Sequence, residues 1–352
     1  MEEKTGLMRP GVLAALGAAV LFGAGTPLAK RLLLGIDPWS LAGFLYLGSG
    51  VGLGTWRLLT RAPRVHLPGA EVAWFGGAIA FGGVLGPVLL LLGLKGMHAS
   101  GAALLLNAES VFTALLAWFV FRENFDRRIA IGMLAIVAGA VVLSGSGAGA
   151  QWSMHDIGSA ALVLGACLAW GIDNNLTRKV SLADATWVAS VKGLVAGSVN
   201  LALALASGAS LPTVPVAAAA MAVGLLAYGV SLSLFVVALR HLGSARTGAY
   251  FSIAPFFGAT LAVFMGDPVT LPLLGAAALM GIGVWLHLTE RHEHLHAHEE
   301  LDHEHWHVHD AHHQHAHDDP VTPATRHSHR HRHEAMTHSH RHVPDVHHRH
   351  EH

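Results

Sequence analysis

Ten long apolar runs, separated by short polar segments, constrain what this chain can fold into. Each run is about 20 residues long, the length of an α-helix that crosses the hydrocarbon core of a bilayer. The runs are continuously apolar rather than alternating, which favours helices over a β-barrel. They lie at residues 11–30, 38–57, 72–94, 99–121, 129–146, 157–177, 186–206, 214–239, 247–265 and 271–289. The sequence therefore predicts an all-α integral membrane protein with ten transmembrane helices in the lipid bilayer.

The composition argues against several other classes of protein. Hydrophobic residues make up 52% of the 352 residues and charged residues only 13%, against about 25% charged in a soluble domain. The net charge of −1 and the lack of a phosphate-binding loop argue against nucleic acid or nucleotide partners. No nucleophile–base set suggests an enzyme, and no cofactor is required. The single cysteine, Cys167, excludes an intramolecular disulfide and is interpreted as a buried small hydrophobe.

Lysine and arginine are distributed unequally between the two sides of the predicted bundle. With a cytoplasmic N-terminus, twelve fall in inside segments: Lys4, Arg9, Arg57, Arg61, Arg64, Arg122, Arg127, Arg128, Arg178, Lys179, Arg240 and Arg246. Three fall outside: Lys30, Arg31 and Lys95. Because cytoplasmic loops are enriched in basic residues, we expect both termini in the cytoplasm of a bacterial cell, with the protein in the inner (plasma) membrane and residues 1–10 as the cytoplasmic N-terminus.

The body of the chain contains an internal repeat. A shift of 145 positions superposes five identical residues within eight: Phe112 on Phe257, Ala114 on Ala259, Leu116 on Leu261, Ala117 on Ala262 and Phe119 on Phe264. A shift of 148 superposes the basic pair Lys30–Arg31 on Arg178–Lys179. We predict two five-helix repeats, 11–146 and 157–289, the second inserted upside down because five is odd. Inverted repeats are typical of secondary transporters.

Several of these motifs resemble the EamA type of the drug/metabolite transporter superfamily. They are the FTALLAW stretch that leads to Glu123, its second-half partner from Ala254-Pro255 to Asp267, and Trp170-Gly171. The resemblance covers roughly residues 10–290 and implies a ten-helix, two-repeat permease for a small solute. Members of that superfamily carry very different solutes. One departure is Ser110, which stands where the second copy has Pro255.

Polar residues at membrane depth are the first candidates for a substrate or coupling site, because they are costly in lipid and usually face a cavity. Glu109 lies mid-span two residues after Asn107, and we expect it to bind a cationic group or carry a coupling proton. A hydrogen-bonded structural role is the alternative. The triplet Asp173-Asn174-Asn175 aligns with Gly25-Thr26-Pro27, where we expect a helix break.

Three further residues complete the predicted site. Lys192 could form an ion pair with Asp173 or with Glu109, or its side chain could extend to the membrane interface. Tyr250 and Ser252 lie opposite Leu105 and Asn107 in the other copy, and they could close a midplane cavity.

From residue 291 the chain changes character, and 23 of the 28 histidines lie between His292 and His352. So polar a segment is expected to be disordered. HxH spacing lets two imidazoles reach one ion, so residues 291–352 are predicted to bind divalent Ni, Co, Zn or Cu. The ligands named are His292, His294, His296, His298, His303, His305, His307, His309, His312, His313, His315, His317, His327, His329, His331 and His333.

Two functions follow from the sequence. The first is a secondary transporter of a metabolite, amino acid or drug-like compound, working by alternating access, with the tail as a metal-binding accessory. The second is a transition-metal transporter or metal-regulated permease. Outside the tail only His66, His98, His155, His241 and His287 remain, near span ends, which favours the first. A homodimer is left open.

Overall fold

The computed structural model describes residues 10–65, 67–121, 127–144, 154–177, 180, 183–235, 237–238, 250–288, 293–298, 301–307, 327–333 and 336–341. The chain divides into two compact units. We call Met1–Glu290 the body and Arg291–His352 the tail. The predicted N-terminal segment 1–10 lies outside the described residues except for Pro10.

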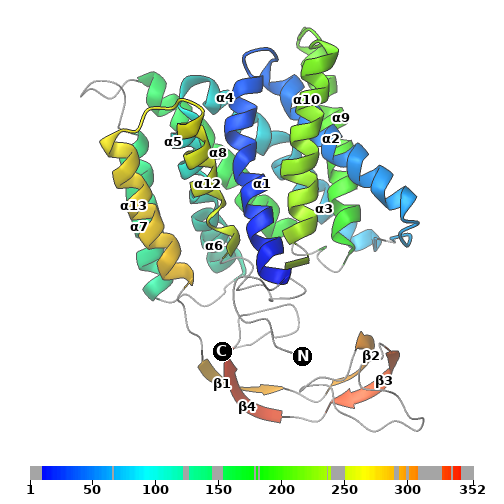
Figure 1. Ribbon diagram of the computed structural model, residues 1–352. Helices are drawn as coiled ribbons and strands as arrows, with labels where there is room; N and C mark the ends of the chain where they lie inside the picture. Colours follow the sequence, from blue (N-terminus) through cyan, green and yellow to red (C-terminus); the bar gives the residue numbers. More distant parts are fainter. Residues whose placement is uncertain are drawn as a thin grey trace. The chain divides into compact units, whose positions relative to one another are not determined.

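Ten helical segments form the described part of the body (Figure 1). Six are single helices: α1 (Pro10–Leu32), α2 (Pro38–Leu59), α7 (Arg127–Ser144), α8 (Met154–Thr177), α9 (Ala185–Ala206) and α13 (Leu271–Leu288). The third consists of α3 (Gly69–Ala78), the π-helix η1 (Ile79–Leu85) and α4 (Gly86–Gly96), and the fourth of α5 (Ala99–Leu105) and α6 (Ala108–Phe121). The eighth contains α10 (Val214–Gly224), the π-helix η3 (Leu225–Val230) and helical residues to Phe235, and the ninth contains α12 (Ala254–Phe264).

Six of these segments are long and apolar enough to cross a membrane: Gly11–Leu32, Glu71–Gly96, Ala99–Leu116, Ile157–Thr177, Ala185–Ala206 and Val214–Phe235. Three shorter apolar helices, Ala130–Leu143, Ala254–Phe264 and Leu271–Leu286, accompany them. The remaining segment, α2, has 22 residues, and five glycines lower its hydropathy. The prediction of an all-helical membrane body is confirmed, and the ten helical segments in the described residues agree with the predicted number of spans.

Local sequence signals explain where several helices begin and end. Asp37 caps α2, because its carboxylate accepts hydrogen bonds from the backbone N–H groups of Trp39 and Ser40 at 3.0 and 3.1 Å. At the other end of a helix, Gly208 (φ 82°) and Gly266 (φ 111°) follow α9 and α12 in the left-handed region. Each ends its helix in the Schellman arrangement that glycine favours.

The two halves carry the same irregularities, which supports the internal repeat. The π-helix η1 starts at Ile79 and η3 at Leu225, 146 residues later. The fourth helical segment breaks at Leu106-Asn107 and the ninth at Ser252-Ile253, again 146 residues apart. Matching π-helices and helix breaks are stronger evidence for a repeat than matching apolar residues, because apolar residues are common throughout the spans.

Helix packing also follows the repeat. The second and seventh spans, α2 and α9, pack together extensively, as do the fifth and tenth, α7 and α13 (Figure 1). The pair α6–α8 has its counterpart in the pair α12–α1. Glycines allow α2 and α9 to approach closely: a Cβ atom on Gly193 would lie 2.6 Å from the backbone nitrogen of Gly50. Small residues at such contacts are typical of helix association in membranes.

One predicted helix break is wrong. The helix α1 runs without interruption through Gly25-Thr26-Pro27, and α8 likewise runs through Asp173-Asn174-Asn175. Pro27 leaves the carbonyl of Gly23 without its usual N–H partner, and that oxygen faces Gly258 of α12, 2.6 Å from where a Cβ on Gly258 would lie. Close packing of a neighbouring helix holds such a proline in place within a membrane helix.

The tail contains four short strands in its described residues. The strand β1 (Glu293–His298) pairs antiparallel with β4 (Met336–Arg341), and β2 (Leu301–His307) pairs antiparallel with β3 (His327–His333). The structure differs here from the expectation of a tail without regular structure. Residues alternate between the two faces of a strand, so the HxH alternation gives each of these segments a histidine face.

Candidate substrate and coupling site

Glu109 lies at the break in the fourth helical segment, in the first turn of α6. Its Oε1 accepts a hydrogen bond from Asn174 Nδ2 of α8 at 2.8 Å. The Glu109 side chain is partly exposed and the Asn174 side chain is exposed. A carboxylate at the N-terminus of a helix is favoured by the helix dipole, so the break itself helps to hold a negative charge at this depth.

The break forms without the proline that the second repeat has. Polar side chains add hydrogen bonds to carbonyls at the break: Asn107 Nδ2 donates to Leu104 O at 3.0 Å, and Ser110 Oγ donates to Asn107 O at 2.7 Å. The thiol of Cys167, on α8, lies 3.5 Å from the carbonyl oxygen of Leu105. Ser110 thus stabilises the break in the first half by a hydrogen bond. Pro255 favours the break in the second half because it has no N–H group to donate to the preceding turn.

The asparagines of the triplet bind α6. Asn174 also donates to Thr113 Oγ1 at 3.2 Å, and Asn175 donates to the Thr113 and Gly171 carbonyls at 3.2 and 2.8 Å. Asn175 is buried and Asn174 is not. Asn175 therefore ties the two helices together, and Asn174 presents its amide beside Glu109.

Asp173 and Lys192 form an ion pair between α8 and α9. Lys192 therefore pairs with Asp173 and not with Glu109, the other partner considered from the sequence. Their side chains are 9% and 17% exposed. The second Asp173 oxygen, Oδ1, accepts from Thr177 Oγ1 at 2.9 Å. Gly82 of η1 leaves room for this carboxylate, because a Cβ atom at that position would overlap it.

The π-helix η1 presents carbonyl groups to side chains of three neighbouring spans. Tyr46 Oη and Trp170 Nε1 both donate to the Gly82 carbonyl, at 2.7 and 3.0 Å. Asn200 Nδ2 donates to the Gly83 carbonyl at 2.9 Å. π-Helical turns occur often at functional sites, and this one lies against the Asp173–Lys192 pair.

Aromatic rings border the same region. Tyr46 stacks on Tyr228 of η3, with ring centroids 5.3 Å apart, and Phe22 meets Tyr228 edge-on. The Gly82 residue whose carbonyl binds the Tyr46 hydroxyl also packs against the Asp173 carboxylate. Sequence reasoning missed Tyr46 and Tyr228, although buried tyrosines usually need a hydrogen-bond partner and the chain has only three tyrosines.

Other predicted site residues lie apart from this cluster. Tyr250 packs with Leu234 against a separate apolar group of Ala14, Ala15 and Ala238. Asn107 is buried and bonds the break itself, and Ser252 lies in the matching break of the ninth segment. The structure therefore brings together Glu109, Asp173, Asn174, Asn175 and Lys192, and it does not bring Tyr250 to them.

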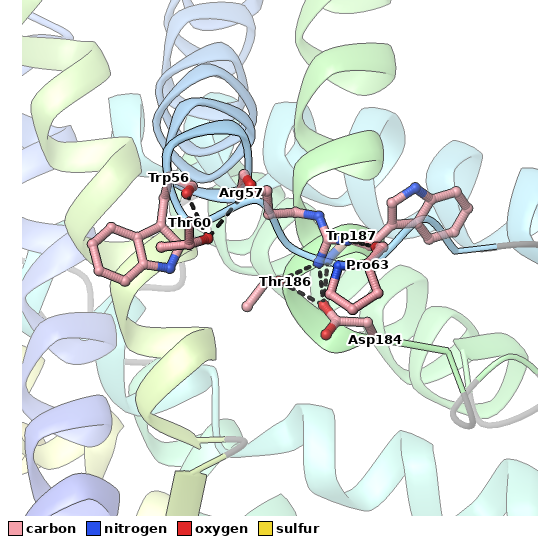
Figure 2. Close-up of polar contacts among 7 residues, drawn as sticks. All are labelled: Trp56, Arg57, Thr60, Pro63, Asp184, Thr186 and Trp187. Carbon is pink, nitrogen blue, oxygen red and sulfur yellow. Dashed lines mark hydrogen bonds and ion pairs between the residues drawn. The ribbon is translucent and has the colours of Figure 1, made fainter.

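At the ends of α2 and α9, Arg57 and Asp184 join the two repeats (Figure 2). Arg57 Nη1 lies 2.6 Å from Asp184 Oδ1 and donates to Thr186 Oγ1 at 2.8 Å. Partial burial alone would raise the pKa of Asp184, but hydrogen bonds from Thr186 and from the Trp187 N–H, together with the charge of Arg57, lower this pKa below its ordinary value. Asp184 also caps α9.

A second polar cluster joins the repeats at the opposite end of the body. Arg31 Nη2 donates to the Met265 carbonyl at 2.7 Å, and Lys30 donates to the Leu94 and Lys95 carbonyls. Asp267 Oδ2 accepts from the backbone N–H of Ser100 at 2.8 Å, in the first turn of α5. These contacts fasten the ends of the first, third, fourth and ninth segments to one another.

A depression of about 490 Å³ lies away from Glu109, between the ends of α4 and α8. Its lining consists of Leu92, Lys95, Gly96, Gly158, Ser159 and Leu162. It is open and has one charged side chain, so the polar cluster at Glu109 remains the better candidate site on its chemistry.

The described residues include no group of three or more His, Cys, Asp or Glu side chains placed to hold a metal ion. Ten of the histidines named from the sequence lie in the strands β1, β2 and β3. The other six, His292, His309, His312, His313, His315 and His317, lie outside the described residues.

The two halves of the body match one family model twice, that of the EamA-like transporter family, over residues 9–145 and 158–289. The chain belongs to this family. An uncharacterized transporter of Methanothermobacter thermautotrophicus is 27% identical over 296 residues, which is 78% of this chain and 85% of the relative. As a member of the EamA-like transporter family, the chain is a multi-pass membrane protein that carries a small solute.

Two further likenesses are narrower. A probable 4-amino-4-deoxy-L-arabinose-phosphoundecaprenol flippase subunit, ArnE, of Pseudomonas fluorescens is 40% identical over 60 residues, 17% of this chain and 53% of the relative. A solved crystal structure matches with a TM-score of 0.59 and 17% identity, covering 78% of this chain and 94% of the other. The structural match shows that the fold is shared.

Proposed function

We propose that this protein is a secondary transporter of a small organic solute, a metabolite, an amino acid or a drug-like compound, in a bacterial cell membrane with both termini in the cytoplasm. The carrying observation is the polar cluster of Glu109, Asn174 and the Asp173–Lys192 pair. It lies where a helix break, α8 and a π-helix meet. Polar groups at this depth are costly and usually mark the path of a transported solute.

Alternating access is the mechanism that this architecture favours. The cluster lies on helices of both repeats, since Glu109 belongs to the first and Asp173 and Lys192 belong to the second. Contacts between repeats at each end of the body, Arg57–Asp184 at one end and Asp267–Ser100 at the other, are suited to open in turn. Rocking one repeat against the other would then expose the cluster to each side.

Metabolite profiling tests this function without knowledge of the substrate. Bacterial cells expressing the full chain are compared with cells expressing Glu109→Gln, and solutes in cells and medium are quantified by mass spectrometry. We expect at least one organic solute whose distribution changes with the wild type and not with Glu109→Gln. Glu71→Gln, which alters a carboxylate at the start of α3, should behave as the wild type.

Equal solute profiles for the wild type and Glu109→Gln, at equal amounts of protein in the membrane, would contradict the proposed site. Elemental analysis of the same cells addresses the second candidate function. A change in cellular Ni, Co, Zn or Cu that depends on Glu109 would make a metal ion the transported solute.

We also propose that the tail binds divalent metal ions. Support comes from the strand register, in which His303, His305 and His307 of β2 stand opposite His331, His329 and His327 of β3. Directly opposite residues have Cβ atoms about 5 Å apart, close enough for two imidazoles to reach one ion. The other face of this pair of strands sets Asp302 opposite Arg332 and Glu304 opposite Arg330.

Equilibrium dialysis of the full chain with Zn²⁺ tests the tail. The triple change His303→Asn, His305→Asn and His307→Asn should lower the number of ions bound, whereas Asp302→Asn with Glu304→Gln on the other face should not. Binding should also fall between pH 7.5 and 5.5, because protonated imidazole does not bind metal. Equal stoichiometry in all three proteins would contradict the tail site.

A further inference from the structure

The charged side chains at membrane depth do not balance. More than one helical turn from the ends of the ten helical segments, the described residues include three charged side chains: Glu109, Asp173 and Lys192. Two are acidic and one is basic. With all three ionised, the cluster carries a net charge of −1.

The single positive charge is committed to Asp173. Lys192 forms its ion pair with Asp173 Oδ2, and Thr177 occupies Oδ1. Both side chains are largely buried between α8, α9 and η1. Removing either partner would leave a buried charge unpaired, which is strongly unfavourable, so this pair is built as a fixed unit.

Glu109 is the carboxylate that remains. Its hydrogen bond in the described structure comes from the neutral amide of Asn174, while an ionised carboxylate offers about four acceptor positions. The Glu109 side chain is partly exposed, and Asn174 beside it is exposed. At membrane depth, the negative charge of this carboxylate must be cancelled by a proton or by a bound cation.

The surroundings favour an organic cation over a metal ion. Glu109 accepts a hydrogen bond from the amide of Asn174, which also donates to the hydroxyl of Thr113, and the described residues there include no set of three ligating side chains. Tyr46 stacks on Tyr228, and its hydroxyl donates to the carbonyl of Gly82, which packs against Asp173, so the border of this region is aromatic. Aromatic faces attract ammonium groups and apolar frames.

We propose that Glu109 binds the protonated amine of a monocationic solute in exchange for a proton. When the amine binds, the Glu109 carboxyl releases one proton to water and its carboxylate pairs with the ammonium group. When the solute leaves, the carboxylate takes up one proton again. This inference rests on the proposed function and names the class of its substrate.

Four probes with the same phenyl frame and different charges test the inference: phenethylamine, phenylethanol, phenylacetate and phenylalanine. Binding to the purified full-length protein is measured by calorimetry at pH 7 in two buffers of different ionisation enthalpy, which gives the number of protons released. We expect phenethylamine to bind at least tenfold more tightly than the other three, with release of one proton.

Three variants separate the role of the carboxylate from effects on folding. Glu109→Gln should weaken phenethylamine binding at least tenfold and abolish proton release, while Glu109→Asp should retain both in part. Glu71→Gln should match the wild type. Thermal unfolding of each variant shows that the protein is folded.

The outcomes are distinct from those for the proposed function. Preference for the neutral, anionic or zwitterionic probe, or phenethylamine binding that persists in folded Glu109→Gln, would overturn the inference and leave the transporter intact. Absence of binding by phenethylamine would also overturn it. Only an unchanged metabolite profile in Glu109→Gln would remove the transport site itself.

Discussion

Asp267 of the second repeat accepts a hydrogen bond from the backbone N–H of Ser100 in the first repeat, over 2.8 Å. His98, the residue at the N-cap position of α5, makes no capping hydrogen bond with its side chain. A residue 167 positions away thus caps a helix that its own sequence leaves uncapped. His98 Nδ1 lies 3.7 Å from the other Asp267 oxygen.

Asp267→Ala should therefore destabilise the start of the fourth segment, at α5. Loss of a cap costs about 1 kcal/mol, so thermal unfolding of the purified protein should shift to lower temperature. Asp267→Asn keeps an acceptor oxygen and should lose less. If Asp267→Ala unfolds at the wild-type temperature, the cross-repeat cap does not stabilise the protein.

Removing Lys192 should be among the most damaging single changes in the body. Lys192→Met leaves Asp173 charged and largely buried, which costs about 3–5 kcal/mol. Adding Asp173→Asn to the same chain should recover most of this loss. Chemical unfolding in detergent gives both values, and a double variant no more stable than Lys192→Met would show that the two residues act separately.

Replacing glycine by alanine should have opposite effects on stability at two positions, Gly224 and Gly76. At Gly224, an added Cβ would lie 2.6 Å from Leu45 Cα of α2, too close without a backbone shift, so Gly224→Ala should cost about 1–3 kcal/mol. At Gly76, nothing lies within 4 Å. Gly76→Ala should be neutral or stabilising by up to about 1 kcal/mol, because alanine has the higher helix propensity.

The Arg57–Asp184 contact should make stability depend on pH in the acid range. The pKa of Asp184 is lower in the folded protein than in the unfolded chain, where Asp titrates near about 3.9. Its contribution is therefore complete above the unfolded pKa and lost as the pH falls through the folded pKa. The difference in unfolding temperature between wild type and Asp184→Asn should be constant from pH 7 to 5 and shrink below about pH 4.

The sequence predicted those parts of the fold that depend on composition and period. Continuous apolar runs specify membrane helices, and the matches between the halves specify the repeat. The π-helices η1 and η3 could not be predicted, because an extra residue in a helical turn leaves the apolar pattern almost unchanged. The break at Gly25-Thr26-Pro27 was predicted from local residue preferences, and close packing against α12 overrides them.

Charge was the sequence signal for the residues that the structure brings together, and the contributions of shape had no such signal. Glu109, Asp173 and Lys192 stand out because charges are rare in apolar spans. The partner of Lys192 depends on Gly82, whose missing side chain admits the Asp173 carboxylate, and that role has no signature in a chain with 40 glycines. Tyr250 was predicted to line the site from its position in the repeat, but in the structure its side chain packs against an alanine cluster away from Glu109.

The only cysteine of the chain, Cys167, is fully buried at the break in the fourth segment. A water-soluble maleimide should leave this native thiol unlabelled, so the wild-type sequence can serve directly as the parent for single-cysteine scanning. Each introduced thiol would then report, by its rate of alkylation from either side, when its position along the path becomes wet during the transport cycle.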